Sequence, residues 1–152
     1  MLLDEIKNLL SLRKDGSLYH RESQTLEFKE SFNFAGLSEY FRDFAAFANN
    51  KGGWLIFGVK DRPKRELIGL NDKSSEQFDK IDPEKISGFL LDLFSGNIVW
   101  KHDVVEIQGM NFGFFFIEEA KIKPIICKKD EGEIRNGEIS VSYTHLTLPT
   151  KA

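Results

Sequence analysis

The segment FANNKGGWLIFGVKD, residues 47–61, decides how the chain folds. Its middle, Trp54 to Val59, is a continuous apolar run, which is typical of a central strand covered on both faces. Before it, residues 37–49 place apolar side chains at helical spacing, and Gly52-Gly53 suits the helix end and the tight turn that follows. The chain therefore passes from an amphipathic helix directly into the centre of a sheet.

The remaining patterns place other elements around this helix and strand. Residues 25–29 alternate between apolar and polar, as a half-buried strand does. Asp82 and Pro83 are typical of a helix N-cap and first helical position, and residues 108–111 have the composition of a hairpin turn. The expected elements are helices at 2–12, 37–49 and 83–94, and strands at 25–29, 54–59, 66–70, 98–107, 112–118, 125–128 and 134–139. This order predicts an α+β (mixed α/β) fold, in which a central mixed sheet of about five to six strands carries three packed helices.

The composition excludes several classes of protein. The length of 152 residues favours one domain, and 14 phenylalanines require a substantial core. The formal net charge of −3 excludes a uniformly basic nucleic-acid coat protein, although it permits a local basic face. The single cysteine, Cys127, leaves no disulfide framework and no cysteine-based zinc site. Because the first residues lack a signal-peptide pattern and the apolar run 112–117 is too short to span a bilayer, we expect a cytoplasmic protein without a membrane partner.

Three carboxylates and one lysine are candidates to meet at one edge of the sheet. Glu27 and Lys29 share the exposed face of their strand, whereas Glu22 reaches Glu27 only if the chain bends between them. Asp61 lies just past the end of the expected central strand, where sites in α/β sheets often form. Carboxylate oxygens suit Mg²⁺ or Mn²⁺, and such an ion could assist the cleavage of a phosphodiester. The alternative is a set of solvated surface carboxylates, which is the commoner situation.

Two groups of basic residues are candidates for contacts with phosphates. The first group, named the basic turn, consists of Lys60, Arg62, Lys64 and Arg65. The second consists of Lys121, Lys123, Lys128 and Lys129, with Arg135 nearby and acidic residues at 130, 131 and 133 beside it. Because charged turns are usually just solvated, charge alone does not decide whether either group binds nucleic acid.

The motifs at residues 22–31 and 46–61 resemble a known family. Glu-x4-Glu-Phe-Lys-Glu-Ser, then Ala-Phe-Ala-Asn-x-Lys-Gly-Gly, then an apolar strand ending Gly-Val-x-Asp look like the Schlafen AlbA-like domain. This family is described as DNA-binding and is widespread in bacterial proteins, often ahead of an ATP-binding or regulatory region. The resemblance implies a nucleic-acid-binding module, with DNA favoured over RNA, inside a larger transcriptional regulator or ATP-binding protein. No particular cofactor is implied for this module, and a homodimer is one assembly that it allows. The residues expected to contact nucleic acid are Lys60, Arg62, Lys64, Arg65 and Lys51.

The same resemblance leaves an enzyme as an alternative. In Schlafen proteins that cleave tRNA or rRNA, the site resembles two glutamates five residues apart followed by an aspartate. This pattern maps onto Glu22, Glu27 and Asp61 as metal ligands and catalytic residues, with Lys29 in support, and implies an endoribonuclease that uses Mg²⁺ or Mn²⁺. Those nucleases have a duplicated core and the family usually carries a later aromatic-x-Arg-x-Gly element, whereas this chain has one copy of the core and lacks the element. A protein-interaction module is the second alternative.

The last residues differ from the rest of the chain. Residues 141–150, VSYTHLTLPT, depart from its phenylalanine, lysine and glutamate usage and resemble translated sequencing adapter, as found at the broken ends of metagenome-derived genes. We therefore expect a Schlafen AlbA-like domain at 1–139, an artefactual tail at 140–152 and a longer natural chain. The alternative is an ordinary β-prone segment.

Overall fold

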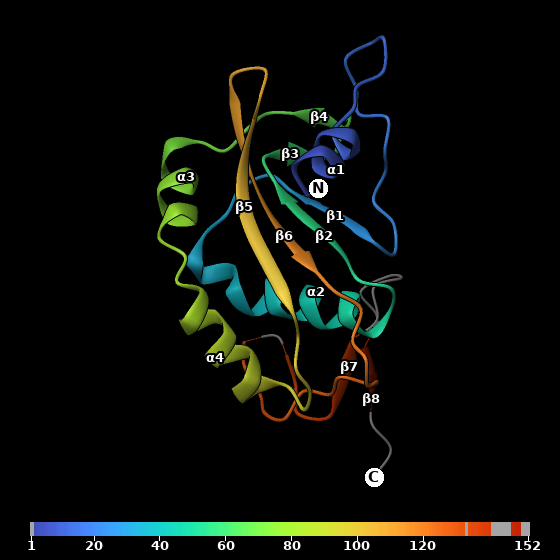
Figure 1. The fold of residues 1–152 in the computed structure, drawn as a ribbon, viewed down its shortest axis with the longest axis vertical. Helices are drawn as coiled ribbons and strands as arrows, with labels where there is room; N and C mark the ends of the chain where they lie inside the picture. Colours follow the sequence, from blue (N-terminus) through green and yellow to red (C-terminus); the bar gives the residue numbers. More distant parts are fainter. Residues whose placement is uncertain (1, 133, 141–146, 150–152) are drawn as a thin grey trace.

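The computed structural model describes residues 2–132 and 134–140 and the backbone of 147–149. Its centre is a four-stranded mixed sheet in the order β1-β2-β6-β5 (Figure 1). The elements are α1 (Leu2–Leu9), β1 (Leu26–Lys29), the 3-10 turn η1 (Phe34–Gly36), α2 (Leu37–Asn49), β2 (Gly53–Phe57), β3 (Val59–Lys60), β4 (Glu66–Leu67), α3 (Asp72–Asp79), α4 (Pro83–Leu93), β5 (Trp100–Ile107), β6 (Met110–Ile117), β7 (Glu138–Ser140) and β8 (Thr147–Pro149). Strand β1 is parallel to β2, while β6 is antiparallel to both β2 and β5. Two separate two-stranded sheets pair β3 with β4 and β7 with β8.

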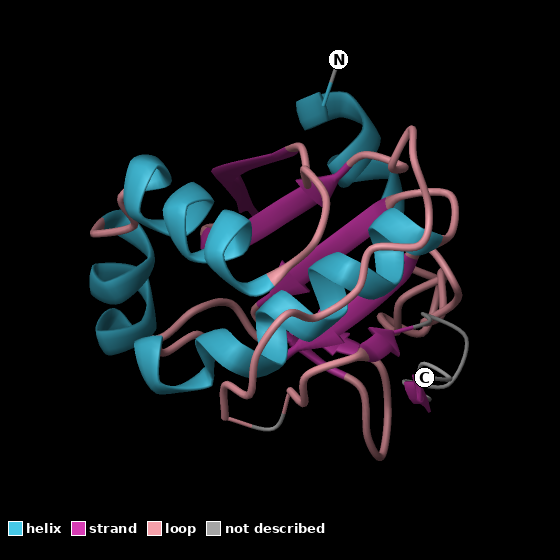
Figure 2. Cartoon of the chain, turned by 90° about the horizontal axis from the view of Figure 1, so that it is seen from below, coloured by secondary structure: helices cyan, strands magenta, loops and turns pink. Residues whose placement is uncertain are grey.

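Helices cover both faces of the central sheet, with α1 on one side and α2 on the other (Figure 2). Alternate residues of β2 and β6 supply the two cores. Leu55 and Phe115 belong to the core that contains α2, α3 and α4, whereas Ile56 and Phe114 belong to the core that contains α1. The apolar runs of the sequence therefore reflect a sheet with no solvent-facing side at its centre.

The mixed α/β class is confirmed, and so are the helix at 37–49, the helix that follows Pro83 and the hairpin at 108–111. The central sheet differs from the expectation because it has four described strands rather than five or six. The apolar run 54–59 divides at Gly58, whose φ of +108° breaks the strand and where a side chain would lie 2.8 Å from the ring of Phe112. Residues 125–128 form only an isolated bridge between Cys127 and Phe94.

The turn from α2 into β2 depends on its glycines and on the last helical residue. Gly52 has a φ of +79°, and a side chain there would meet the carbonyl of Ile117 at 2.6 Å. Asn49 donates hydrogen bonds to the carbonyls of Ile125 (3.1 Å) and Ser140 (3.0 Å) and accepts one from the N–H of Ile125 (2.6 Å). The motif at 49–53 is therefore a structural turn that fastens α2 to later parts of the chain.

The expected tail falls largely outside the described residues, because 141–146 and 150–152 are not among them. Ser140 belongs to β7, and residues 147–149 pair with β7 in antiparallel register. Among the described residues, no helix is both long enough and apolar enough to cross a bilayer.

Candidate functional site

The bend that Glu22 needs in order to approach β1 is present. Ser23 and Leu26 form a bridge in which the Ser23 N–H donates to the Leu26 carbonyl at 2.9 Å, so the preceding chain folds back along β1. The Glu22 Oε2 then accepts a hydrogen bond of 3.0 Å from the N–H of Phe28. Glu22 thereby satisfies a main-chain donor on an outer strand of the central sheet.

Glu22, Glu27 and Asp61, named the carboxylate cluster, interact electrostatically. Although Glu22 is exposed as a residue, its carboxyl group lies against β1, and this burial is the largest cause that raises its pKa from 4.5 to about 7. The hydrogen bond from Phe28 opposes the rise in pKa, whereas the charges of Glu27 and Asp61 and a hydrogen bond to Glu27 add to it. The Glu22 carboxyl thus keeps its proton to a higher pH than an ordinary glutamate does, and a hydrogen bond joins it to Glu27.

The geometry of the carboxylate cluster decides whether it can hold a divalent ion. Within residues 2–132 and 134–140, no group of three or more Asp, Glu, His or Cys side chains is arranged to hold a metal. In this arrangement the residues do not fit Mg²⁺ or Mn²⁺.

Lys29 joins β1 to α2 through an ion cluster. Its Nζ lies 2.8 Å from Glu39 Oε1, 3.6 Å from Asp43 Oδ2 and 3.9 Å from Glu27 Oε1. Burial alone lowers the pKa of Lys29, but the charges of Asp43, Glu39 and Glu27 outweigh it and hold the pKa above its ordinary value. Lys29 is therefore a fixed cation beside the carboxylate cluster.

Sequence reasoning missed the two helical partners of Lys29. Asp43 is only 2% exposed, and Glu39 lies one helical turn before it on α2. The signal that points to Asp43 is its position, because it is an acidic residue inside the apolar stretch 40–48. A buried carboxylate on such a face requires a cation opposite it.

The four basic side chains of the basic turn differ in their contacts, because two of them are bound to another loop and two are not. The side chains of Lys60 and Arg62 make no hydrogen bond or ion pair with any residue that the structure describes, and Arg62 is exposed. Lys64 and Arg65 donate to main-chain carbonyls of the loop at 13–21, at 3.1 and 3.0 Å. Lys60 and Arg62 are thus the members best placed to contact a phosphate.

The other basic candidates lie apart from the basic turn. Lys51 is exposed two residues before β2, so the length of that strand separates it from Lys60. Two members of the second basic group and the neighbouring Arg135 bind other parts of the chain: Lys123 contacts Glu119 (2.7 Å) and the Asn50 carbonyl (2.7 Å), Lys129 pairs with Asp92, and Arg135 donates to the Gly132 carbonyl (2.6 Å). These contacts hold loops together rather than presenting free cations.

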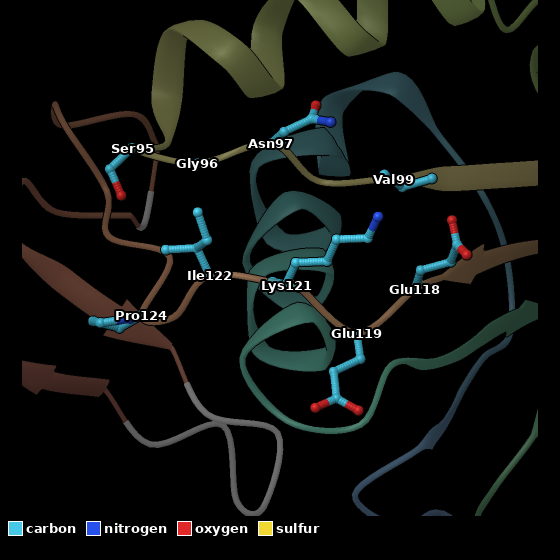
Figure 3. Close-up of a pocket in the computed structure, with 10 residues that line it drawn as sticks. Ser95, Gly96, Asn97, Val99, Glu118, Glu119, Lys121, Ile122 and Pro124 are labelled. Atoms are coloured by element: carbon cyan, nitrogen blue, oxygen red, sulfur yellow. The ribbon is translucent and has the colours of Figure 1, made fainter.

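A surface hollow of about 370 Å³ lies between the connection from α4 to β5 and the segment after β6 (Figure 3). The side chains of Glu118 and Lys121 extend from the latter segment toward Asn97 and Val99. None of its lining residues belongs to the carboxylate cluster or to the basic turn. This pocket therefore does not coincide with the candidate site.

Comparison with known proteins identifies the family. Residues 22–144 match the Schlafen, AlbA_2 family, so the chain belongs to it, as the resemblance of the motifs predicted. An uncharacterized ATP-binding protein of Ureaplasma parvum serovar 3, UU034, is 36% identical over 165 aligned positions, which cover 97% of this chain and 45% of that protein. The chain thus spans less than half the length of this relative.

Two solved structures resemble the fold. The DIP2311 protein from Corynebacterium diphtheriae matches with a TM-score of 0.60 and 18% identity, over 97% of this chain and 26% of that chain. The N-terminal domain of a RecG-related protein from Nitrosomonas europaea matches with a TM-score of 0.48 and 21% identity, over 89% and 85% of the two chains. The first match supports the fold, and the second is too distant to support any inference.

Proposed function

We propose that the chain is a nucleic-acid-binding module, with DNA as the preferred ligand, within a larger regulatory or ATP-binding protein. The observation that carries the proposal is a pair of cations, Lys60 and Arg62, whose side chains bind nothing in the described part of the chain and which share a turn with two further basic residues. Membership of the Schlafen, AlbA_2 family supports it, and the name of the Ureaplasma relative supports the larger context. Phosphate contacts of this kind release counterions, so binding weakens steeply with salt.

A titration of labelled DNA by fluorescence anisotropy tests this proposal. The double variant Lys60→Glu with Arg62→Glu is expected to weaken binding at low salt and to reduce the slope of log affinity against log salt by about 2. The matched control is Lys73→Glu with Lys85→Glu, which makes the same charge change at two exposed lysines on α3 and α4. Equal loss of affinity in both double variants would show a general charge effect and would contradict the assigned surface. A parallel titration with RNA of the same sequence tests the preference for DNA.

A metal-dependent endoribonuclease is the second candidate, and one observation favours it. Glu22, Glu27 and Asp61 interact electrostatically beside Lys29, although they are not arranged to hold an ion. The test is cleavage of structured RNA such as tRNA with Mg²⁺ or Mn²⁺, by the wild type and by Glu27→Ala. Cleavage that disappears in the variant, with RNA binding retained, supports the enzyme. A folded wild type that cuts no RNA with either metal contradicts it, and a wild type that binds no nucleic acid favours a protein-interaction module.

A further inference from the structure

The loop at residues 13–21, named the tyrosine loop, is fixed to the basic turn. The Leu18 N–H donates to the Arg65 carbonyl at 3.0 Å, and the Arg65 Nη2 donates back to the Leu18 carbonyl at 3.0 Å. The Lys64 Nζ adds a hydrogen bond of 3.1 Å to the carbonyl of Asp15. Figure 1 shows the loop, in blue after α1, projecting at the end of the molecule beside β4. The tyrosine loop and the basic turn are therefore parts of one surface.

Internal hydrogen bonds hold the shape of the tyrosine loop. The Arg13 N–H donates to the Ser17 carbonyl at 2.7 Å, and the Asp15 Oδ1 accepts from the Ser17 N–H at 2.9 Å and from its hydroxyl at 2.5 Å. These two bonds from Ser17, followed by the charges of Lys64 and Arg13, lower the pKa of Asp15 and keep it ionised. A loop that is ordered before binding loses little conformational freedom when a ligand arrives, which favours affinity.

Tyr19 presents an aromatic ring at this surface. It is 62% exposed, in contrast to Tyr40, which is 4% exposed in the core. The Arg13 guanidinium lies over the ring at 6.0 Å from its centroid, and the His20 ring stands nearly perpendicular to it at 5.2 Å. Such contacts steady a ring without burying it. A supported, exposed aromatic ring is a platform on which another flat ring system can stack.

The charge around Tyr19 defines the kind of ring that would stack there. The tyrosine loop and the basic turn, residues 13–21 and 60–65, together contain seven Lys or Arg residues and two acidic ones, although the whole chain has a net charge of −3. These seven are Arg13, Lys14, Arg21, Lys60, Arg62, Lys64 and Arg65. A ligand that combines a flat aromatic group with repeated negative charge matches this surface, and a nucleotide strand has both.

We propose that Tyr19 stacks on an unpaired nucleobase while the tyrosine loop and the basic turn contact the flanking phosphates. This inference rests on the proposed function and deepens it, because it names the ligand class as single-stranded or looped nucleic acid. In a duplex the bases are stacked on one another and their faces are closed to a side chain, whereas an unpaired base offers its face to Tyr19.

The test compares single-stranded and duplex DNA of one sequence, labelled with fluorescein and about 12 nucleotides long, with the complete chain. Tyr19→Ala is expected to weaken single-strand binding about 5- to 150-fold, the range measured for loss of one base–aromatic stack. Tyr19→Phe, which keeps the ring, is expected to bind within about twofold of the wild type.

Two further measurements separate stacking from a charge effect. Because no charge is removed, the dependence of Tyr19→Ala binding on salt concentration stays that of the wild type. Phe89→Ala, at another exposed ring (51%) on α4, is the matched control and leaves binding unchanged.

Two results would overturn the inference. One is a Tyr19→Ala variant that binds the single strand as tightly as the wild type, and the other is an equal loss on single strand and duplex. If Lys60→Glu with Arg62→Glu weakens binding while Tyr19→Ala does not, the stacking role fails and the proposed function stands. If the folded wild type binds neither probe, the proposed function itself fails.

Discussion

At the scale of single residues, Glu22 makes the stability of the fold depend on pH. Its pKa is about 7 in the folded chain against an ordinary 4.5, so between these values the folded state binds more protons than the unfolded state. The stabilisation that this group contributes is complete below pH 4.5 and is lost as the pH rises through about 7. Glu22→Gln keeps an acceptor for the Phe28 N–H and a donor toward Glu27, and it carries no charge to lose.

We therefore predict that Glu22→Gln and the wild type unfold at similar temperatures at pH 4.5, and that the variant is more stable at pH 8. The expected difference is on the order of 1–3 °C, since solvent screens a group at an exposed residue. Thermal unfolding by circular dichroism from pH 4.5 to 8.5 measures it, with Glu106→Gln at an exposed site on β5 as the control. A difference that does not grow with pH, or one that equals the control, would contradict the raised pKa.

The residues of the candidate site were predictable to different degrees. The spacing of Glu22 and Glu27 required a bend, and the bridge between Ser23 and Leu26 supplies it. Asp43 was absent from the expected site because its role depends on α2 packing across β1, a tertiary contact without a local sequence pattern. Tyr19 was missed for a related reason, since a polar, turn-rich loop has no periodicity that shows which side chain faces solvent.

At the scale of elements, the strength of a local pattern decided which helices and strands could be predicted. The helix α2 has a wide apolar stripe, and α4 is capped by Asp82, whose side chain accepts from the Glu84 N–H at 3.0 Å. The helix α3 escaped prediction because its sequence, DKSSEQFD, has Phe78 as its one apolar residue. The available signal was its N-cap, Asn71, whose side chain accepts from the Ser74 N–H at 2.7 Å.

The junction of α2 with later segments yields a prediction at this scale. Asn49→Asp keeps the acceptor for the Ile125 N–H but loses both donated bonds and directs a carboxylate at the Ile125 and Ser140 carbonyls. We predict a loss of about 2 kcal/mol or more in the free energy of unfolding, measured by urea denaturation. Asn49→Ala, which loses all three bonds, is expected to be similarly destabilised, whereas Asn97→Ala in an exposed loop changes little. A stable Asn49→Asp variant would show that these bonds do not hold the segments together.

At the scale of the whole molecule, the carboxylate cluster and the basic turn lie outside the two cores that cover the sheet. The centre of the sheet is buried on both faces, and the candidate site lies at the edge formed by β1 and at the turn after β3. The overall charge of −3 therefore averages a carboxylate cluster and a basic surface that meet along this edge. This division explains why composition could exclude a uniformly basic protein and still be compatible with local binding of nucleic acid.

The extent of the buried core along the sequence predicts how much of the chain the domain needs. Among the described residues, every buried apolar side chain lies at or before Ile134, and the Ser140 carbonyl accepts from Asn49. A chain that ends at Ser140 should therefore unfold cooperatively within about 5 °C of the complete chain. A chain that ends at Gly137 loses β7, including the ion pair of Glu138 with Arg42 (3.1 Å) and the hydrogen bond from the Cys127 N–H (2.9 Å), and should be much less stable. Differential scanning calorimetry of the three lengths distinguishes the cases. Loss of cooperative unfolding in the chain that ends at Ser140 would show that the last twelve residues are part of the folding unit, which an adapter-derived tail would not be.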